Sequence, residues 1–83
     1  MDTEITTVLQ YKGCDIKVKI DVITITHRNG YNRKFTIERK HKYAFIRNQD
    51  NYLLPLKFDK YKNPYEIATA LIDFIKATTK ILD

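Results

Sequence analysis

The chain has one cysteine, two glycines, two prolines and no tryptophan among its 83 residues. The single thiol, Cys14, excludes an internal disulfide, whereas small secreted domains usually depend on several. We therefore expect a reducing, cytoplasmic location. The apolar runs fall far short of the roughly 18 residues of a membrane-spanning helix, and residues 1–4 lack the basic-then-apolar order of a signal peptide. We expect no membrane partner.

Side chains suited to catalysis or metal binding are scarce, namely Cys14, His27 and His41. Their spacing matches no zinc motif, so we expect no metal site and no cofactor. Cys14 occupies the apolar side of an alternating segment, where a free thiol usually packs as a small hydrophobe. His41 lies between Lys40 and Lys42, with no second catalytic group beside it. These observations predict a protein that is not an enzyme.

The composition, 43% hydrophobic and 30% charged, is too apolar for a disordered chain. The length of 83 residues is too short for two hydrophobic cores. We expect a single domain over residues 1–83. Such a chain buries only about 60 to 65% of the surface that its unfolded form exposes, so a partner or a homodimer would add useful stability.

Alternation of apolar and polar residues predicts several strands. In the clearest of them Cys14, Ile16, Val18 and Ile20 share one face. After Asp21 the apolar residues move from even to odd positions, which we interpret as a bulge or a bend.

Turn signals divide the remaining strands. Lys12-Gly13 and Asn29-Gly30 predict hairpins, and the basic segment 39–42 reads as a further connecting turn. Pro55 lacks an amide proton and therefore predicts an edge strand. The β-like runs cover residues 5–11, 14–20, 22–27, 31–38, 43–47 and 52–58.

One helix follows. Asn63 is a suitable N-cap, Pro64 suits the first helical position, and Glu66 has the spacing of a capping box, so the helix should cover residues 64–80 approximately. The predicted class is α+β, with a small antiparallel sheet of four to six hairpin-connected strands within residues 5–58 and a C-terminal helix packed on it.

The apolar arc of this helix is wider than docking on a flat sheet requires. Ile67, Leu71, Phe74, Thr78 and Ile81 form one stripe, and Ala68, Ile72 and Ile75 widen the arc to about 200°. Two explanations are open: the helix lies deep in a curved sheet, or its shoulder, Ile72 and Ile75, contacts another subunit.

Positive charge is concentrated in residues 28–47, where seven cations face Glu38 alone and all four arginines of the chain occur. Arginine and lysine bind phosphates, and aromatic rings stack on bases. We therefore predict a nucleic-acid-binding hairpin with Tyr31 and Tyr43 as stacking residues and with seven cationic contacts: Arg28, Arg33, Lys34, Arg39, Lys40, Lys42 and Arg47.

Other interpretations of these charges stay open. Arg33 and Arg39 share strand parity with the apolar Phe35 and Ile37, so the cations could simply maintain solubility. The alternative function is a protein-binding adaptor or inhibitor that uses a sheet edge or the helix shoulder on an acidic partner. The residue usage, rich in Ile, Lys, Asn and Tyr, is typical of AT-rich genes of phages and some bacteria. The tyrosine-containing segment 57–65 is a second candidate recognition surface.

Residues 43–74 invite a comparison. They comprise Tyr43-Ala44-Phe45-Ile46-Arg47, a run from Leu54 to Phe58, and Asn63-Pro64-Tyr65-Glu66-Ile67-Ala68 with Ala70 and Asp73. This pattern resembles the strand-strand-helix end of plant ethylene-response-factor DNA-binding domains, and it is similar to the arm-binding domains of tyrosine recombinases and, in its strand-then-helix order, to whirly-type single-strand binders. The resemblance implies a sheet laid against DNA, with contacts from Arg28, Arg33, Arg39 and Arg47. This chain departs from the pattern in having no tryptophan, five residues between strand and helix, and an additional N-terminal hairpin.

Overall fold

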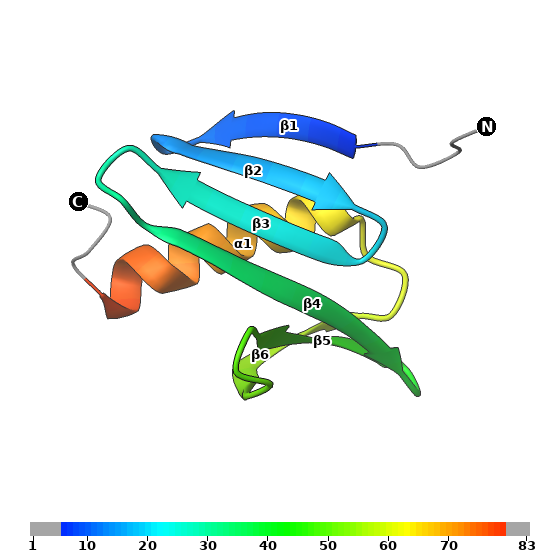
Figure 1. Cartoon of the computed structure of the whole chain (residues 1–83). Coiled ribbons are helices and arrows are strands. Elements are labelled where there is room, and N and C mark those ends of the chain that lie inside the picture. Colours follow the sequence, from blue (N-terminus) through cyan, green and yellow to red (C-terminus); the bar gives the residue numbers. More distant parts are fainter. Residues whose placement is uncertain (1–5, 80–83) are drawn as a thin grey trace.

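The computed structural model describes residues 6–79 and confirms the predicted α+β class. Six antiparallel strands lie side by side in chain order and are followed by one helix (Figure 1). The elements are β1 (Thr6–Tyr11), β2 (Cys14–Lys19), β3 (Val22–His27), β4 (Asn32–Lys40), β5 (Tyr43–Asn48), β6 (Leu53–Asp59) and α1 (Pro64–Thr78). Ile5, Lys80 and Ile81, which the sequence assigned to the first strand and to the helix, lie outside the described residues.

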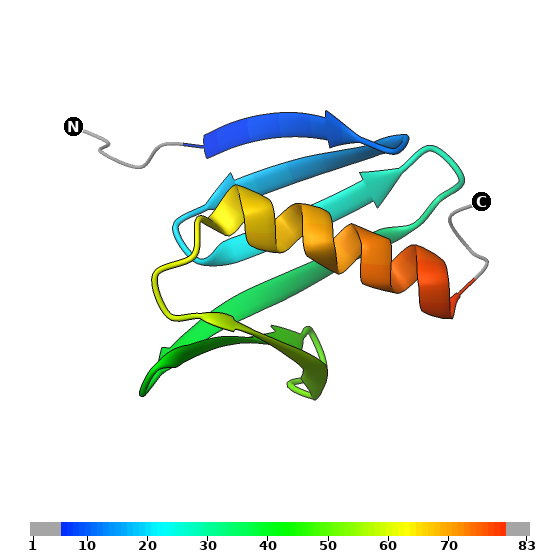
Figure 2. The same ribbon diagram turned by 180° about the vertical axis from the view of Figure 1, so that it is seen from behind.

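The helix crosses one face of the sheet and leaves the opposite face open, as the two opposed views show (Figures 1 and 2). The core between helix and sheet is built from the inward residues of β2 to β5 and from α1. It comprises Cys14, Ile16, Val18, Ile23, Ile25, Phe35, Ile37, Ala44, Ile46, Ile67, Ala68, Leu71, Ile72 and Ile75. Among residues 6–79, α1 therefore covers one face of the sheet, and no element covers the other.

The wide apolar arc of α1 is explained by burial within the chain. Ile72 is 0% exposed and Ile75 6% exposed, and both belong to the core. Their assignment as interface residues is therefore wrong, because these side chains pack on the chain's own sheet. Of the two explanations for the arc, deep packing is the one that the structure supports.

Tight turns set the register of the sheet. Lys19 pairs with Val22, so Ile20 and Asp21 form a two-residue turn between β2 and β3. The change of apolar parity at this point arises from that turn, and the predicted bulge or bend is wrong. The sequence does not predict this turn, because turns with a positive φ usually contain glycine or asparagine, and here Ile20 adopts φ 56°.

The basic segment 39–42 also differs from its prediction. Arg39 and Lys40 belong to β4, whose ladder with β5 continues to the Lys40 and Tyr43 pair. The turn itself is only His41 and Lys42, with His41 at φ 60°. Because Arg39 lies in a strand, the alternation of the strand determines on which face of the sheet its side chain lies.

The predictions for Pro55 and for the start of the helix hold. Strand β6 is one edge of the sheet. The N-cap is Asn63, whose Oδ1 accepts a hydrogen bond from the Tyr65 amide at 2.7 Å. The predicted capping box does not form, because the Asn63 side chain binds the amide of Tyr65 and the Glu66 side chain forms an ion pair with Lys62 at 3.3 Å. Within the described residues, no helix is long and apolar enough to cross a membrane.

Candidate nucleic-acid interface

The alternation of β4 divides the predicted cations between the two sheet faces. Arg33 lies opposite the buried Ile25, and Arg39 lies opposite the buried Ala44. Directly paired residues share a face, so both arginines are on the side of the helix. The even-numbered Lys34 and Lys40 are on the open face. The predicted residues therefore do not form one surface.

Arg39 is a structural clamp. Its Nη2 lies 3.1 Å from Oδ1 of Asp21, and its Nη1 donates hydrogen bonds to the carbonyl oxygens of Lys60 and Lys62. The guanidinium thus joins the turn between β2 and β3 to the loop that enters α1. Because its donors are used by a carboxylate and two carbonyls, this partly buried guanidinium stabilises the fold and is not available to bind a phosphate.

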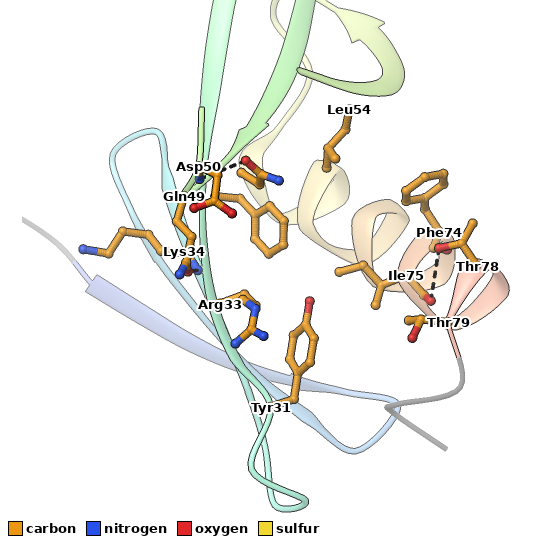
Figure 3. A pocket seen from close by; sticks show the side chains of 12 residues that line it. Tyr31, Arg33, Lys34, Gln49, Asp50, Leu54, Phe74, Ile75, Thr78 and Thr79 are labelled. Carbon is orange, nitrogen blue, oxygen red and sulfur yellow. Dashed lines mark hydrogen bonds between the residues drawn. The ribbon is translucent and has the colours of Figure 1, made fainter. Parts of the chain in front are cut away.

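Tyr31 and Arg33 lie in a pocket between the sheet and the C-terminal half of α1 (Figure 3). The guanidinium carbon of Arg33 is 5.3 Å from the centroid of the Tyr31 ring, and its Nη1 donates to the Asn32 carbonyl at 2.9 Å. Burial raises the pKa of Tyr31. Because its ring packs against the core, Tyr31 is not placed to stack on a ligand at the open face.

Arg47 and Arg28 also lack a common role. Arg47 donates to Oε1 of Glu38 at 2.9 Å and to the Asn51 carbonyl at 3.0 Å, which ties β4 to the turn between β5 and β6. Arg28 is exposed in the turn between β3 and β4, at the opposite end of β4 from Lys40. Consequently the four arginines do not converge.

Lysines and aromatic rings do converge at the end of the sheet where β4 and β6 end and β5 begins. We call this surface the basic–aromatic patch, and it comprises Lys40, Lys42, Tyr43, Phe45, Lys57, Lys60 and Tyr61. Nζ of Lys57 lies 4.3 Å from the centroid of the Tyr43 ring, and Tyr43 and Phe45 meet edge to face at 6.2 Å. Tyr43 is 41% exposed.

The second half of the patch continues around the end of the sheet. The amide of Lys60 donates to the Lys42 carbonyl at 3.1 Å, which places the loop after β6 beside the turn after β4. Nζ of Lys60 lies 5.7 Å from the Tyr61 ring centroid, and Tyr61 is 84% exposed. A shallow hollow here is lined by His41, Lys42, Asp59, Lys60 and Tyr61.

Two features hold this loop in place. Asp59 Oδ1 accepts a hydrogen bond from the Tyr61 amide at 2.9 Å, and Arg39 binds the carbonyls on either side of Tyr61. Two carboxylates lie beside the four lysines of the patch: Asp59 lines the hollow, and Glu38, which pairs with Phe45 on the open face, is bound by Arg47. The result is a positively charged surface with two presented rings.

The patch joins two parts of the sequence that were predicted separately. Lys40, Lys42 and Tyr43 came from the basic window, and Lys57 and Tyr61 from the segment 57–65. The sequence is consistent with Phe45 either as a stacking ring or as a core residue, and Phe45 was not among the predicted contacts. Only the pairing of Phe45 with Lys57 across β5 and β6 reveals that it lies on the open face. Lys34 shares that face, and Gln49 accepts a hydrogen bond from its amide.

Cys14 and His27 pair across β2 and β3 on the helix side. Cys14 is fully buried, and burial raises the pKa of its thiol, which disfavours the thiolate needed for nucleophilic chemistry. Nδ1 of the buried His27 accepts a hydrogen bond from the Asn29 amide at 3.1 Å. In residues 6–79 no group of three or more His, Cys, Asp or Glu side chains could hold a metal ion.

No protein family, curated protein or solved structure matches this chain. The likeness of residues 43–74 to plant DNA-binding domains is thus one of pattern. Of its four implied contacts, Arg33 and Arg39 lie on the helix side, so the set cannot act together on the open face.

Proposed function

We propose that the protein is a non-enzymatic module that binds nucleic acid through the basic–aromatic patch. The observation that carries the proposal is the Tyr43 ring, exposed on the open face with Lys57 beside it and Lys40 paired to it across the ladder. A ring and cations in this arrangement suit a base stacked next to its own phosphates. The binding surface is therefore an end of the open sheet face, in place of the arginine-rich hairpin as a whole.

Single-stranded nucleic acid is the form that this chemistry favours. Tyr43 and Tyr61 can stack on bases only where those bases are unpaired, and lysines contact phosphates without selecting a sequence. If all four patch lysines contact phosphates, the logarithm of the binding constant should fall with the logarithm of salt concentration with a slope of about −3.

Fluorescence anisotropy tests this proposal. Labelled single- and double-stranded DNA and RNA are titrated with the full chain at several salt concentrations. We expect salt-sensitive binding that is tighter for single strands. The variant K40A/K42A should weaken binding and reduce the magnitude of the slope by about 1.4.

The matched control is R28A/R33A, which removes the same charge away from the patch. It should leave affinity near that of the wild type, apart from a small general electrostatic effect. Equal losses in the two double variants would mean that net charge, and not the patch, determines binding. The absence of binding at low salt would refute the proposed function.

A further inference from the structure

The two edges of the sheet differ in their chemistry. The β6 edge contains Pro55, Lys57 and Asp59, which are the residue types that normally prevent an edge from pairing with another strand. The β1 edge, Thr6–Tyr11, contains no proline and no charged residue. Its Val8 is 59% exposed and its Leu9 38% exposed. Only the β6 edge is therefore protected against strand addition.

Strand β1 is available for further pairing. It pairs with β2 along its whole length, from Thr6 with Lys19 to Tyr11 with Cys14. Within residues 6–79 no strand lies on its other side. The backbone groups that point away from β2 form a regular row of donors and acceptors, which is a template for an added antiparallel strand.

We propose that this strand is β1 of a second copy of the chain. A two-fold axis perpendicular to the sheet would join six strands from each copy into one continuous sheet with both open faces on the same side. Such an axis can pass through the position of Val8. Each Val8 then faces its symmetry mate on the open face, and β-branched cross-strand pairs of this kind are favourable.

The net charge of +5 does not prevent two copies from pairing at this edge, because the nearest open-face cations of the two copies lie well apart. The nearest described cation on the open face is Lys17, which pairs with Val8 from β2. In the dimer the two copies of Lys17 would be three strand spacings apart, roughly 14 Å. This separation exceeds the Debye length of about 8 Å at physiological ionic strength, so their repulsion is screened.

The opposite edge does not offer this arrangement. Pairing at β6 would bring together two copies of Lys57 and would have to accommodate Pro55. The β1 dimer instead leaves the basic–aromatic patch free, because the patch is at the β4 to β6 side of each copy. Dimerisation is thus independent of nucleic-acid binding, and its test needs no ligand.

Analytical ultracentrifugation of the full chain over a range of concentrations provides the test. An interface of one short strand is small, so we expect a reversible monomer–dimer equilibrium with a dissociation constant in the micromolar range or weaker. The variant V8K places a charge on the exposed edge and should weaken the dimer at least about tenfold. T26K is the matched control, because it adds the same charge to the exposed open face of β3, away from the edge.

Amide hydrogen exchange of the wild type provides a second measurement that does not depend on a variant. Protection of amides in β1 should rise with protein concentration, whereas protection in β6 should not. A chain that stays monomeric at every concentration would overturn the proposal. This outcome includes the case in which β1 pairs with a strand of a different protein. A dimer that V8K and T26K weaken equally would also overturn it, as would concentration-dependent protection in β6 instead of β1.

Discussion

The two faces of β4 carry cations of different kinds and for different purposes. On the helix side, Arg33 packs on Tyr31, and Arg39 binds Asp21 and two carbonyls. On the open side, Lys40 is exposed beside Tyr43. Adjacent residues of one strand therefore have a structural role and a candidate binding role. A count of positive residues along a segment does not describe a surface until strand parity has divided it.

The largest effect should come from removing the clamp on the helix side. Arg39→Ala leaves the Asp21 carboxylate and two loop carbonyls without their donor, and we expect a loss of about 2 to 3 kcal/mol in the free energy of unfolding. Lys40→Ala, one residue away and exposed, should change it by less than about 0.5 kcal/mol. Urea denaturation of both variants measures the difference. Similar losses of stability in the two variants would mean that Arg39 contributes no more to the fold than the exposed Lys40 does.

The two tyrosines provide the next contrast. Tyr43→Ala should reduce affinity for single strands by about 1 to 3 kcal/mol, because a stacking ring is lost, with little effect on stability. Tyr31→Ala should destabilise the fold, because Tyr31 packs against the core, and should leave affinity unchanged in the folded fraction. Anisotropy and thermal unfolding of each variant separate the two effects. A Tyr31→Ala variant that folds normally but fails to bind would reverse the assignment.

The turn that sets the parity of the sheet offers a stabilising change. Ile20 has a positive φ and an exposed side chain, so it gains little from burial and its backbone is strained. Ile20→Gly should increase stability by about 1 kcal/mol. An unchanged amide spectrum of β2 and β3 would show that the register is kept. Destabilisation by this variant would contradict the turn geometry.

The smallest effect concerns an ion pair at the rim of the covered face. Lys12 Nζ lies 2.8 Å from Oδ1 of Asp73, and the Tyr11 hydroxyl donates to the same carboxylate at 3.2 Å, so the first hairpin is tied to α1. The hydrogen bond from Lys12 lowers the pKa of Asp73 below its ordinary value of 3.8.

A carboxyl whose pKa is lower in the folded state stabilises the protein above its unfolded pKa and loses this contribution as the pH falls through the folded value. Wild-type stability should therefore decrease slightly more than that of Asp73→Asn below about pH 4. Thermal melts of both proteins from neutral to acidic pH measure this difference. Parallel curves would show that the exposed pair contributes nothing.

Much of the fold follows from local sequence signals. The alternation from Cys14 to Val18, the Asn29-Gly30 turn and the Asn63 cap each specify an element through short-range physics, and the structure confirms them. Ile20, predicted to share the face of Cys14, lies instead in the turn after β2 and is exposed. The turn at Ile20 was misread because its residues carry no turn chemistry. Tertiary pairing, rather than local preference, places it there.

The candidate site was only partly predictable. The sequence prediction placed all seven cations of the basic window in one site, although Arg33 shares strand parity with Phe35, and the structure divides them between the two sheet faces. The meeting of Lys57 with Tyr43 depends on the register between β5 and β6, which contains an irregularity between Phe45 and Arg47. The irregular stretch of β6 contains Pro55, a residue type found at edges and bulges, but Pro55 alone does not specify which residues of β5 and β6 pair, so the patch could not be assembled from the sequence.

The most direct test of the central claim is a titration of the isotopically labelled full chain with a single-stranded oligonucleotide, followed by amide chemical shifts. Our account predicts that the shifts of Tyr43, Phe45, Lys57 and Tyr61 change with a common dissociation constant, while those of Tyr31 and Arg33 stay in place. Changes confined to the turn between β3 and β4 and to the helix-side pocket, or no changes at low salt, would contradict it.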